Sequence, residues 1–144
     1  MAEAALSAAQ VEGPCRMVRA AAVQADDLLG ARGYLFCMPE NLGGLSGEMK
    51  EFCDRTYYPL LGRIEGRAYA TIVAAGTDGT GAERQMDRVA AGWRLRRVAE
   101  SLIVRNGAQT PEAILAPKTV DEQALEGCRN LGQALSGGLA LGIF

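Results

Sequence analysis

Two glycine-rich segments hold the residues best suited to chemistry in this sequence. Residues 40–45 read ENLGGL and follow the apolar run 34–38, and residues 76–81 read GTDGTG and follow the apolar run 69–75. Glycine reaches positive φ angles and lets the main chain come close to a bound molecule. Both segments are therefore predicted to be ligand-binding loops.

The side chains offer little catalytic chemistry of their own. The chain contains no histidine, which excludes Ser-His-Asp and Cys-His groups and most zinc sites. The four cysteines form no CxxC pair and are predicted to be free, buried thiols rather than disulfides or metal ligands: Cys15, Cys37, Cys53 and Cys128. No catalytic side chain and no metal ligand is predicted, so an enzymatic activity would depend on a cofactor.

Each candidate binding residue or loop can also be explained by a purely structural role. The GTDGTG string matches neither the GK[ST] ending of a Walker A loop nor the GxGxxG dinucleotide pattern. Glycine-rich turns after strands are common, so one loop is a weak signal and two in succession are a stronger one. Glu40 and Asn41 either cap a turn or contact a ligand, and Asp78 more often forms a turn. Trp93 is predicted to pack in the core rather than stack on a substrate.

The elements that must position these loops follow from the hydrophobic pattern. Unbroken apolar runs indicate strands buried on both faces of a parallel sheet. Pro39 should end the first of them, Ser46 should cap the next helix, and Thr110 before Pro111 predicts a helix start. Strands are expected at 15–20, 34–38, 69–75 and 98–104; helices are expected at 2–10, 46–58, 82–93 and 121–135, with a helical turn at 26–29 and Gly137-Gly138 ending or weakening the last helix.

This alternation predicts an α/β fold in which a parallel sheet is covered by helices on both faces. At 144 residues the chain is expected to form a single domain, residues 1–144. In such sheets ligands bind beyond the carboxyl ends of the strands, which is where both glycine-rich loops are expected.

The composition of the chain limits the classes of partner and the cellular location that can be expected. A net charge of −2 argues against nucleic acid, which requires a basic surface. No stretch is long enough to span a bilayer, and the N-terminus lacks the basic region of a signal peptide. Together with the reduced cysteines, these features predict a cytoplasmic protein.

The stretch PENLGGLSGEMKEFCDRT resembles the flavin loop of flavodoxin-like NAD(P)H-dependent FMN and quinone reductases. The family pattern is a proline, a loop of small residues and then G-x-M/L-K-x-F-x-D. The matching residues are Pro39, Gly43, Gly47, Met49, Lys50, Phe52 and Asp54. GTDGTG resembles the second flavin loop of the quinone-reductase branch.

The resemblance implies a flavodoxin-like three-layer αβα sandwich that binds FMN between the two loops and takes electrons from NAD(P)H. The cofactor-binding residues it implies are Pro39, Glu40, Asn41, Leu42, Gly43, Gly44, Gly76, Thr77, Asp78 and Gly79. Family members order their strands 2-1-3-4-5, and their first strand leads into a phosphate-binding loop. On this alignment residues 15–20 are the second strand, so the first, central strand and its loop are missing. Either the protein begins upstream of a mis-assigned start or it is a truncated form. FMN binding by residues 1–144 is accordingly expected to be weak or absent.

Three functions remain open from the sequence. The first is a flavin-dependent oxidoreductase that passes electrons from NAD(P)H to a quinone or similar small-molecule acceptor. The second is an electron carrier of the flavodoxin type, ranked lower because both loops lack aromatic residues and the chain is only weakly acidic. The third is a non-catalytic binding module. A homodimer or homotetramer is expected, with Tyr57 and Tyr58 at a helix end near the interface.

Overall fold

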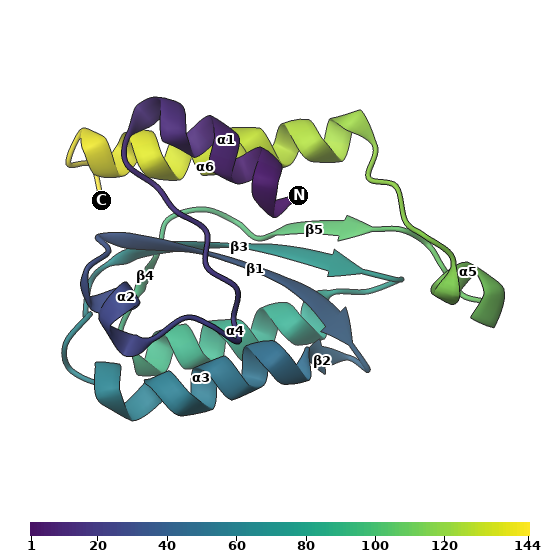
Figure 1. Cartoon of the computed structure of the whole chain (residues 1–144), viewed down its shortest axis with the longest axis horizontal. Helices are drawn as coiled ribbons and strands as arrows, with labels where there is room; N and C mark the ends of the chain where they lie inside the picture. Colours follow the sequence, from purple (N-terminus) through teal and green to yellow (C-terminus); the bar gives the residue numbers. More distant parts are fainter.

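The computed structural model describes residues 1–144 and is built around one five-stranded sheet (Figure 1). Four of the strands are parallel: β1 (Gly33–Asn41), β3 (Ala68–Ala75), β4 (Arg96–Arg97) and β5 (Leu102–Arg105). The fifth strand, β2 (Gly44–Leu45), turns back antiparallel to the end of β1. β1 pairs with β3 from Gly33↔Ala68 to Pro39↔Ala74, and β4 and β5 follow on the other side of β3.

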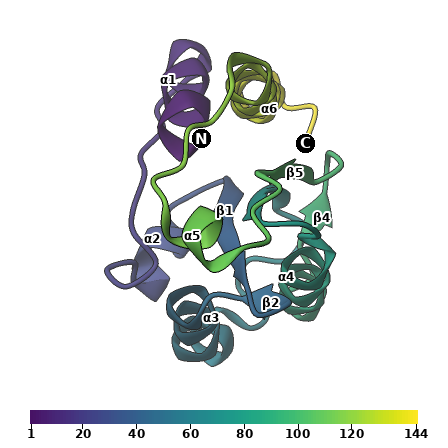
Figure 2. The same ribbon diagram turned by 90° about the vertical axis from the view of Figure 1, so that its right-hand side faces the viewer.

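Helices cover both faces of the sheet, as the view along the strands shows (Figure 2). One layer holds α1 (Ala2–Glu12) and α6 (Glu122–Ala140), and the other holds α3 (Gly47–Leu60) and α4 (Thr80–Gly92). The short helices α2 (Ala25–Leu29) and α5 (Pro111–Leu115) lie in connections. The predicted α/β architecture with three layers is thereby confirmed. None of the helices combines the length and apolar composition needed to cross a membrane.

β1 divides its side chains between the two layers. Tyr34, Phe36 and Met38 are buried in the main core under α3 and α4, whereas Leu35 and Cys37 pack against the smaller clusters on the α1–α6 side. Pro39 does not end the strand as predicted, because β1 continues to Asn41.

The reason that Pro39 is tolerated lies in the direction of its backbone groups. The carbonyls of Arg67, Tyr69 and Ala75 accept hydrogen bonds from the β4–β5 side. Because the direction of the backbone groups alternates along a strand, the N–H and C=O groups of the even-numbered residues of β3 point toward β1. In this register the backbone groups of Gly33, Leu35, Cys37 and Pro39 point away from β3, toward the opposite edge of β1. The missing N–H of proline therefore removes no bond to β3.

Several local predictions are confirmed. Ser46 caps α3, since its hydroxyl accepts from the Met49 N–H, and Thr110 caps α5 with Pro111 in the first turn. Trp93 lies in the core with no exposed surface, and Phe52 is buried beside it.

The strand predicted at 15–20 is wrong. These residues are irregular and cross in front of the free edge of β1 on the way from α1 to α2 (Figure 1). A strand is defined by backbone bonds to a neighbour, and residues 15–20 pair with no strand of the sheet, the free edge of β1 included.

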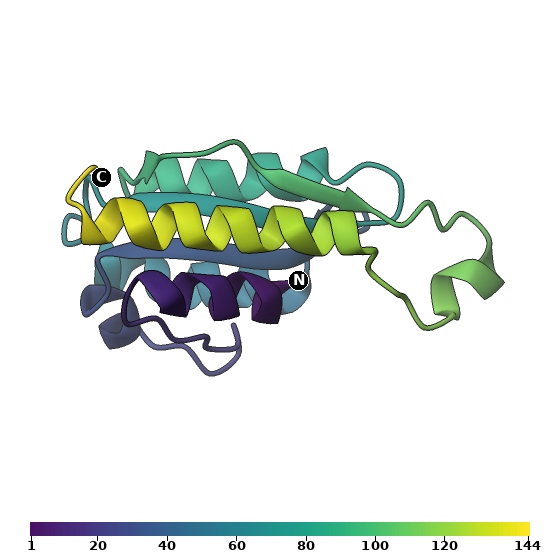
Figure 3. The ribbon, with the colours of Figure 1, turned by 90° about the horizontal axis from the view of Figure 1, so that it is seen from above.

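Two further boundaries differ from the predictions. Only 102–105 of the predicted strand 98–104 forms β5, with Arg96 and Arg97 pairing separately as β4. The last helix does not end at Gly137-Gly138 but continues to Ala140. α1 and α6 lie side by side in the view from above (Figure 3), and Gly132 permits this contact, because a Cβ there would lie 2.2 Å from the Ala5 carbonyl oxygen.

Candidate functional site

The two glycine-rich loops meet at the carboxyl ends of β1 and β3. β1 and β2 are joined by a hairpin turn at Leu42-Gly43, and the loop after β3 leads into α4. A Cβ placed on Gly81 would lie only 1.9 Å from the carbonyl oxygen of Gly43. The main chains of the two loops are thus in direct contact, and glycine at position 81 is required for it.

Glu40 joins the loops through its carboxylate. One oxygen accepts the Gly79 N–H at 2.8 Å, and the other accepts the N–H groups of Gly81 and Ala82 at 2.9 and 3.1 Å. Gly79 is the N-cap of α4, so the carboxylate occupies the positive end of that helix. Of the two roles considered for Glu40, the structure shows capping, and these three N–H groups are not free to hold another anion.

Other N–H groups of the loops have no acceptor within the protein. Leu42 and Gly43 on the first loop, and Thr77 and Asp78 on the second, donate no hydrogen bond to the chain. All four residues are exposed. This edge of the sheet therefore presents free backbone donors from two adjoining loops.

The Asp78 side chain is held locally. Its carboxylate accepts the Thr80 hydroxyl at 2.7 Å, which lowers the pKa of Asp78 below its ordinary value, and Arg105 donates to the Asp78 carbonyl at 2.7 Å. These contacts shape the second loop and leave the Asp78 N–H pointing to no protein group.

The remaining predicted residues fall into two groups. Pro39 and Asn41 are exposed, and Gly76 is half-buried. Gly44 and Gly79 have structural reasons to be glycine: a Cβ at Gly44 would lie 2.9 Å from the Gln85 side chain, and Gly79 has φ +93° with Ile103 2.4 Å from its Cβ position.

Sequence reasoning missed Gln85 altogether, and it included Gly81 in the second loop without indicating its contact with Gly43. Gln85 on α4 accepts the Leu45 N–H at 2.8 Å, and Gly81 allows the close approach of Gly43. Both partners lie about forty positions away in the chain, so no local pattern could have indicated the pairs.

Leu42 is unusual in both backbone and side chain. It has φ +52° followed by Gly43 at +73°, the pair of positive angles found in a two-residue hairpin turn. A leucine in this region is strained, and its side chain is fully exposed at 109%. An apolar side chain is thus held out at the tip of the first loop with no packing in the protein to explain it.

Replacing Leu42 with glycine should raise the free energy of unfolding by about 1 kcal/mol, because glycine adopts a positive φ without strain. Urea denaturation measures the change. Leu61→Gly is the matched control: Leu61 is also exposed but has φ −59°, so glycine there should not stabilise the protein. Equal effects at both positions would contradict the assignment of strain to Leu42.

The cysteines offer no reactive thiolate at this site. All four are free, and burial raises the pKa of both Cys37 and Cys53 to about 12. At neutral pH these two thiols are protonated and behave as small apolar groups. Nowhere in the chain do three or more His, Cys, Asp or Glu side chains cluster as metal ligands would.

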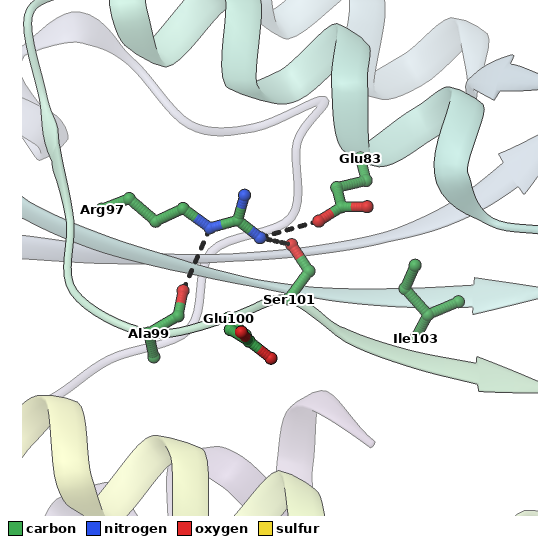
Figure 4. A pocket seen from close by; sticks show the side chains of 6 residues that line it. All are labelled: Glu83, Arg97, Ala99, Glu100, Ser101 and Ile103. Atoms are coloured by element: carbon green, nitrogen blue, oxygen red, sulfur yellow. Dashed lines mark hydrogen bonds and ion pairs between the residues drawn. The ribbon is translucent and has the colours of Figure 1, made fainter.

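Two hollows of the surface are lined by no residue of the glycine-rich loops. One, of about 530 Å³, lies beside β4 and β5, and Figure 4 shows Arg97 at its side. The Arg97 guanidinium donates to Glu83 at 2.7 Å and Asp87 at 2.8 Å, and also to Ser101. Its charge is neutralised, which makes this a structural network. The other hollow lies at the amino ends of β1 and β3, around Gly66 and Leu139.

Comparison with solved structures identifies the fold. A flavodoxin from the domain Archaea superposes with a TM-score of 0.73 at 12% identity, covering 96% of this chain and 87% of that one. A WrbA-like flavodoxin from Agrobacterium tumefaciens gives 0.72 at 14% identity, covering 96% and 86%. Rubredoxin oxygen:oxidoreductase from Desulfovibrio gigas gives 0.77 at 10% identity, covering 97% of this chain and 32% of its own.

No protein-family model and no curated protein sequence matches the chain. At these sequence identities the structural matches support the architecture of the chain and not its chemistry. They agree with the layers and the parallel sheet described above, with helices on both faces. The chain has a flavodoxin-like fold.

Proposed function

We propose that this protein is a flavin-dependent oxidoreductase that binds FMN against the two glycine-rich loops and passes electrons from NAD(P)H to a quinone or similar small molecule. The observation that carries the proposal is the junction of the loops, where Gly81 packs on Gly43 at the carboxyl edge of the sheet. The structural neighbours are named as flavodoxins and an oxidoreductase, which favours a redox function. A cytosolic location, where NAD(P)H is available, belongs to the same proposal.

The residues present fit the ring of a flavin better than its phosphate. The free N–H groups at Leu42, Gly43, Thr77 and Asp78 are donors of the kind that can bind the polar edge of a planar ring, and the absence of side chains at the glycines lets a ring approach the main chain. The chemistry that FMN supplies when bound is hydride acceptance and electron transfer. The role of this chain would be to hold and orient the ring and to expose it to an acceptor.

The helix N-terminus at the loops, that of α4, is not available to bind a phosphate. The α4 N-terminus binds anions by its nature, yet the Glu40 carboxylate holds its N–H groups. A second negative charge there would also be repelled by Glu40. We therefore expect residues 1–144 to bind FMN no more tightly than riboflavin.

Titration of flavin fluorescence with the protein tests this directly. We expect weak quenching of both riboflavin and FMN, with dissociation constants above about 1 μM and within about threefold of each other, because the phosphate contributes no bond. Sub-micromolar binding selective for FMN would reveal a phosphate site elsewhere. Failure of both compounds to bind at millimolar concentration would overturn the proposal.

A pair of variants locates the ring. Leu42→Asp should weaken riboflavin binding at least about tenfold, since a charge at the loop tip disfavours an apolar ring. Leu141→Asp is the matched control, because Leu141 is also exposed, at 77%, but follows α6 far from the loops. Equal loss in both variants would contradict a site at the loops.

Assays of electron transfer distinguish the three functions that the sequence left open. Oxidation of NAD(P)H in the presence of flavin and a quinone indicates a reductase. Flavin that exchanges electrons with chemical reductants but is not reduced by NAD(P)H indicates a carrier of the flavodoxin type. Absence of flavin binding leaves the non-catalytic binding module.

A homodimer or homotetramer remains part of the proposal. Tyr57 stacks on Trp93 inside the protein at 5.8 Å, whereas Tyr58 and Leu61 at the end of α3 are 79% and 48% exposed. Aromatic residues on an open helix end favour an interface there. Sedimentation at micromolar concentration should show a dimer or tetramer that Tyr58→Asp dissociates; a monomeric parent protein would contradict it.

A further inference from the structure

We infer that Arg105 is a specificity-determining residue of the flavin site, whose guanidinium favours the reduced, negatively charged ring over the oxidised, neutral one. This inference rests on the proposed binding of a flavin at the two glycine-rich loops. It begins from the position of Arg105 as the last residue of β5. There it pairs with Ala75, the residue that comes directly before the second loop.

The guanidinium of Arg105 is held on one side and unused on the other. Its Nε donates to the Asp78 carbonyl at 2.7 Å, and this is the only bond of the side chain, which forms no ion pair. Arg97 differs, because its guanidinium is neutralised by Glu83 and Asp87. A guanidinium is planar, always charged and carries five N–H donors. Arg105 is exposed, so its remaining donors are available to a ligand at this edge of the sheet.

The backbone after β5 is fastened to the second loop. The Asn106 N–H donates to the Ala75 carbonyl at 3.0 Å, and the Gly107 N–H donates to the Gly76 carbonyl at 2.8 Å. Together with the strand pairing, these bonds fix the main chain on both sides of Arg105. The side chain is therefore positioned before any ligand arrives, as a specific contact requires.

The second loop lies in a positive surrounding. The bond from the Thr80 hydroxyl is the largest cause of the lowered pKa of Asp78, and the charges of Arg105 and Arg84 lower that pKa further. Both arginines therefore act on this loop, against the one carboxylate of Asp78. The other carboxylate of the site, Glu40, lies against the positive end of α4, which offsets its charge.

Reduction places a negative charge where Arg105 can act on it. A hydride from NAD(P)H carries two electrons and one proton, so the neutral ring gains one negative charge and the donor is left with one positive charge. We expect the polar edge of the ring at the free N–H groups of Thr77 and Asp78, on the loop that Arg105 contacts. Fixed donors favour the state in which charge develops beside them, and charge near a flavin tunes its potential.

Equilibrium dialysis of riboflavin provides the test, with the oxidised compound and with the dithionite-reduced compound at mildly alkaline pH without oxygen. Riboflavin has no phosphate, so any effect of Arg105 acts through the ring. We expect the parent protein to bind the reduced form at least about tenfold more tightly than the oxidised form.

The Arg105→Gln variant should lose about tenfold of this preference, which equals about 30 mV in the two-electron potential of bound riboflavin. Its affinity for the oxidised form should change by less than about threefold, which shows that the site is intact. Arg105→Lys keeps the charge and should retain more of the preference than Arg105→Gln. Added salt should reduce the preference, since the side chain is exposed.

Arg88→Gln is the matched control. Arg88 is exposed on α4 and makes no hydrogen bond or ion pair, so this variant removes the same charge two turns beyond the loops and should leave the preference unchanged. Equal loss in Arg88→Gln and Arg105→Gln, or an undiminished preference in Arg105→Gln, would overturn the inference. Weaker binding of FMN but not of riboflavin in Arg105→Gln would assign the arginine to the phosphate and would also overturn it.

The same titrations distinguish this inference from the proposed function. Binding of riboflavin by the parent protein without preference for the reduced form would overturn the role of Arg105 and leave the flavin site standing. Failure of both forms of riboflavin to bind would overturn the flavin site, and the role of Arg105 with it.

Discussion

Replacing Trp93 with alanine should lower the free energy of unfolding by about 4 kcal/mol. Trp93 has no exposed surface and packs with the rings of Phe36, Phe52 and Tyr57 at centroid distances of 6.5, 6.2 and 5.8 Å. Truncating a buried tryptophan removes its apolar burial and leaves a cavity, which costs about 3–5 kcal/mol. Urea denaturation followed by circular dichroism measures the loss.

Two variants separate packing from other effects. Trp93→Phe keeps most of the ring but loses the bond from the indole N–H to the Tyr57 carbonyl at 3.1 Å, and should cost about half as much. Tyr58→Ala removes an aromatic ring that is 79% exposed and should change stability by less than about 1 kcal/mol. A loss at Trp93 no larger than that at Tyr58 would contradict the assignment of the core.

Glu40→Ala should lower the free energy of unfolding by about 3 kcal/mol and separate the two loops. The carboxylate accepts three N–H groups from the start of α4. Bonds to a charged group contribute about 1.5–3 kcal/mol each, and their sum is reduced here because Glu40 is only half-buried. The same variant should weaken flavin binding, since the first loop would no longer be held against Gly81.

The Glu40→Gln variant distinguishes the contribution of the negative charge to stability from that of the side-chain shape. The amide keeps one oxygen for the Gly79 N–H but places an NH₂ group against the others, so the loss should lie between zero and that of alanine. Glu100→Ala is the control, because Glu100 is exposed and makes no hydrogen bond or ion pair. If Glu100→Ala and Glu40→Ala were equally destabilising, the carboxylate would not hold the loops together.

Local chemistry determined much of this fold from the sequence. The apolar runs 34–38 and 69–75 form β1 and β3 because a strand buried on both faces needs apolar residues throughout. Ser46 and Thr110 cap their helices through N–H groups three residues away, so nothing distant is involved. The succession of these elements was enough to predict the layers and the edge at which the two loops lie.

Contacts between distant residues decided the rest. Residues 15–20 have the pattern of a strand but pair with no strand of the sheet, and pairing is a property of the whole sheet. α6 continues through Gly138 because the helix packs there on the Phe144 ring, which a Cβ would meet at 2.2 Å. Glu40 could equally have capped a turn or faced a ligand on sequence grounds. Its role was decided only when folding brought the α4 N-terminus, about forty residues away, to its carboxylate.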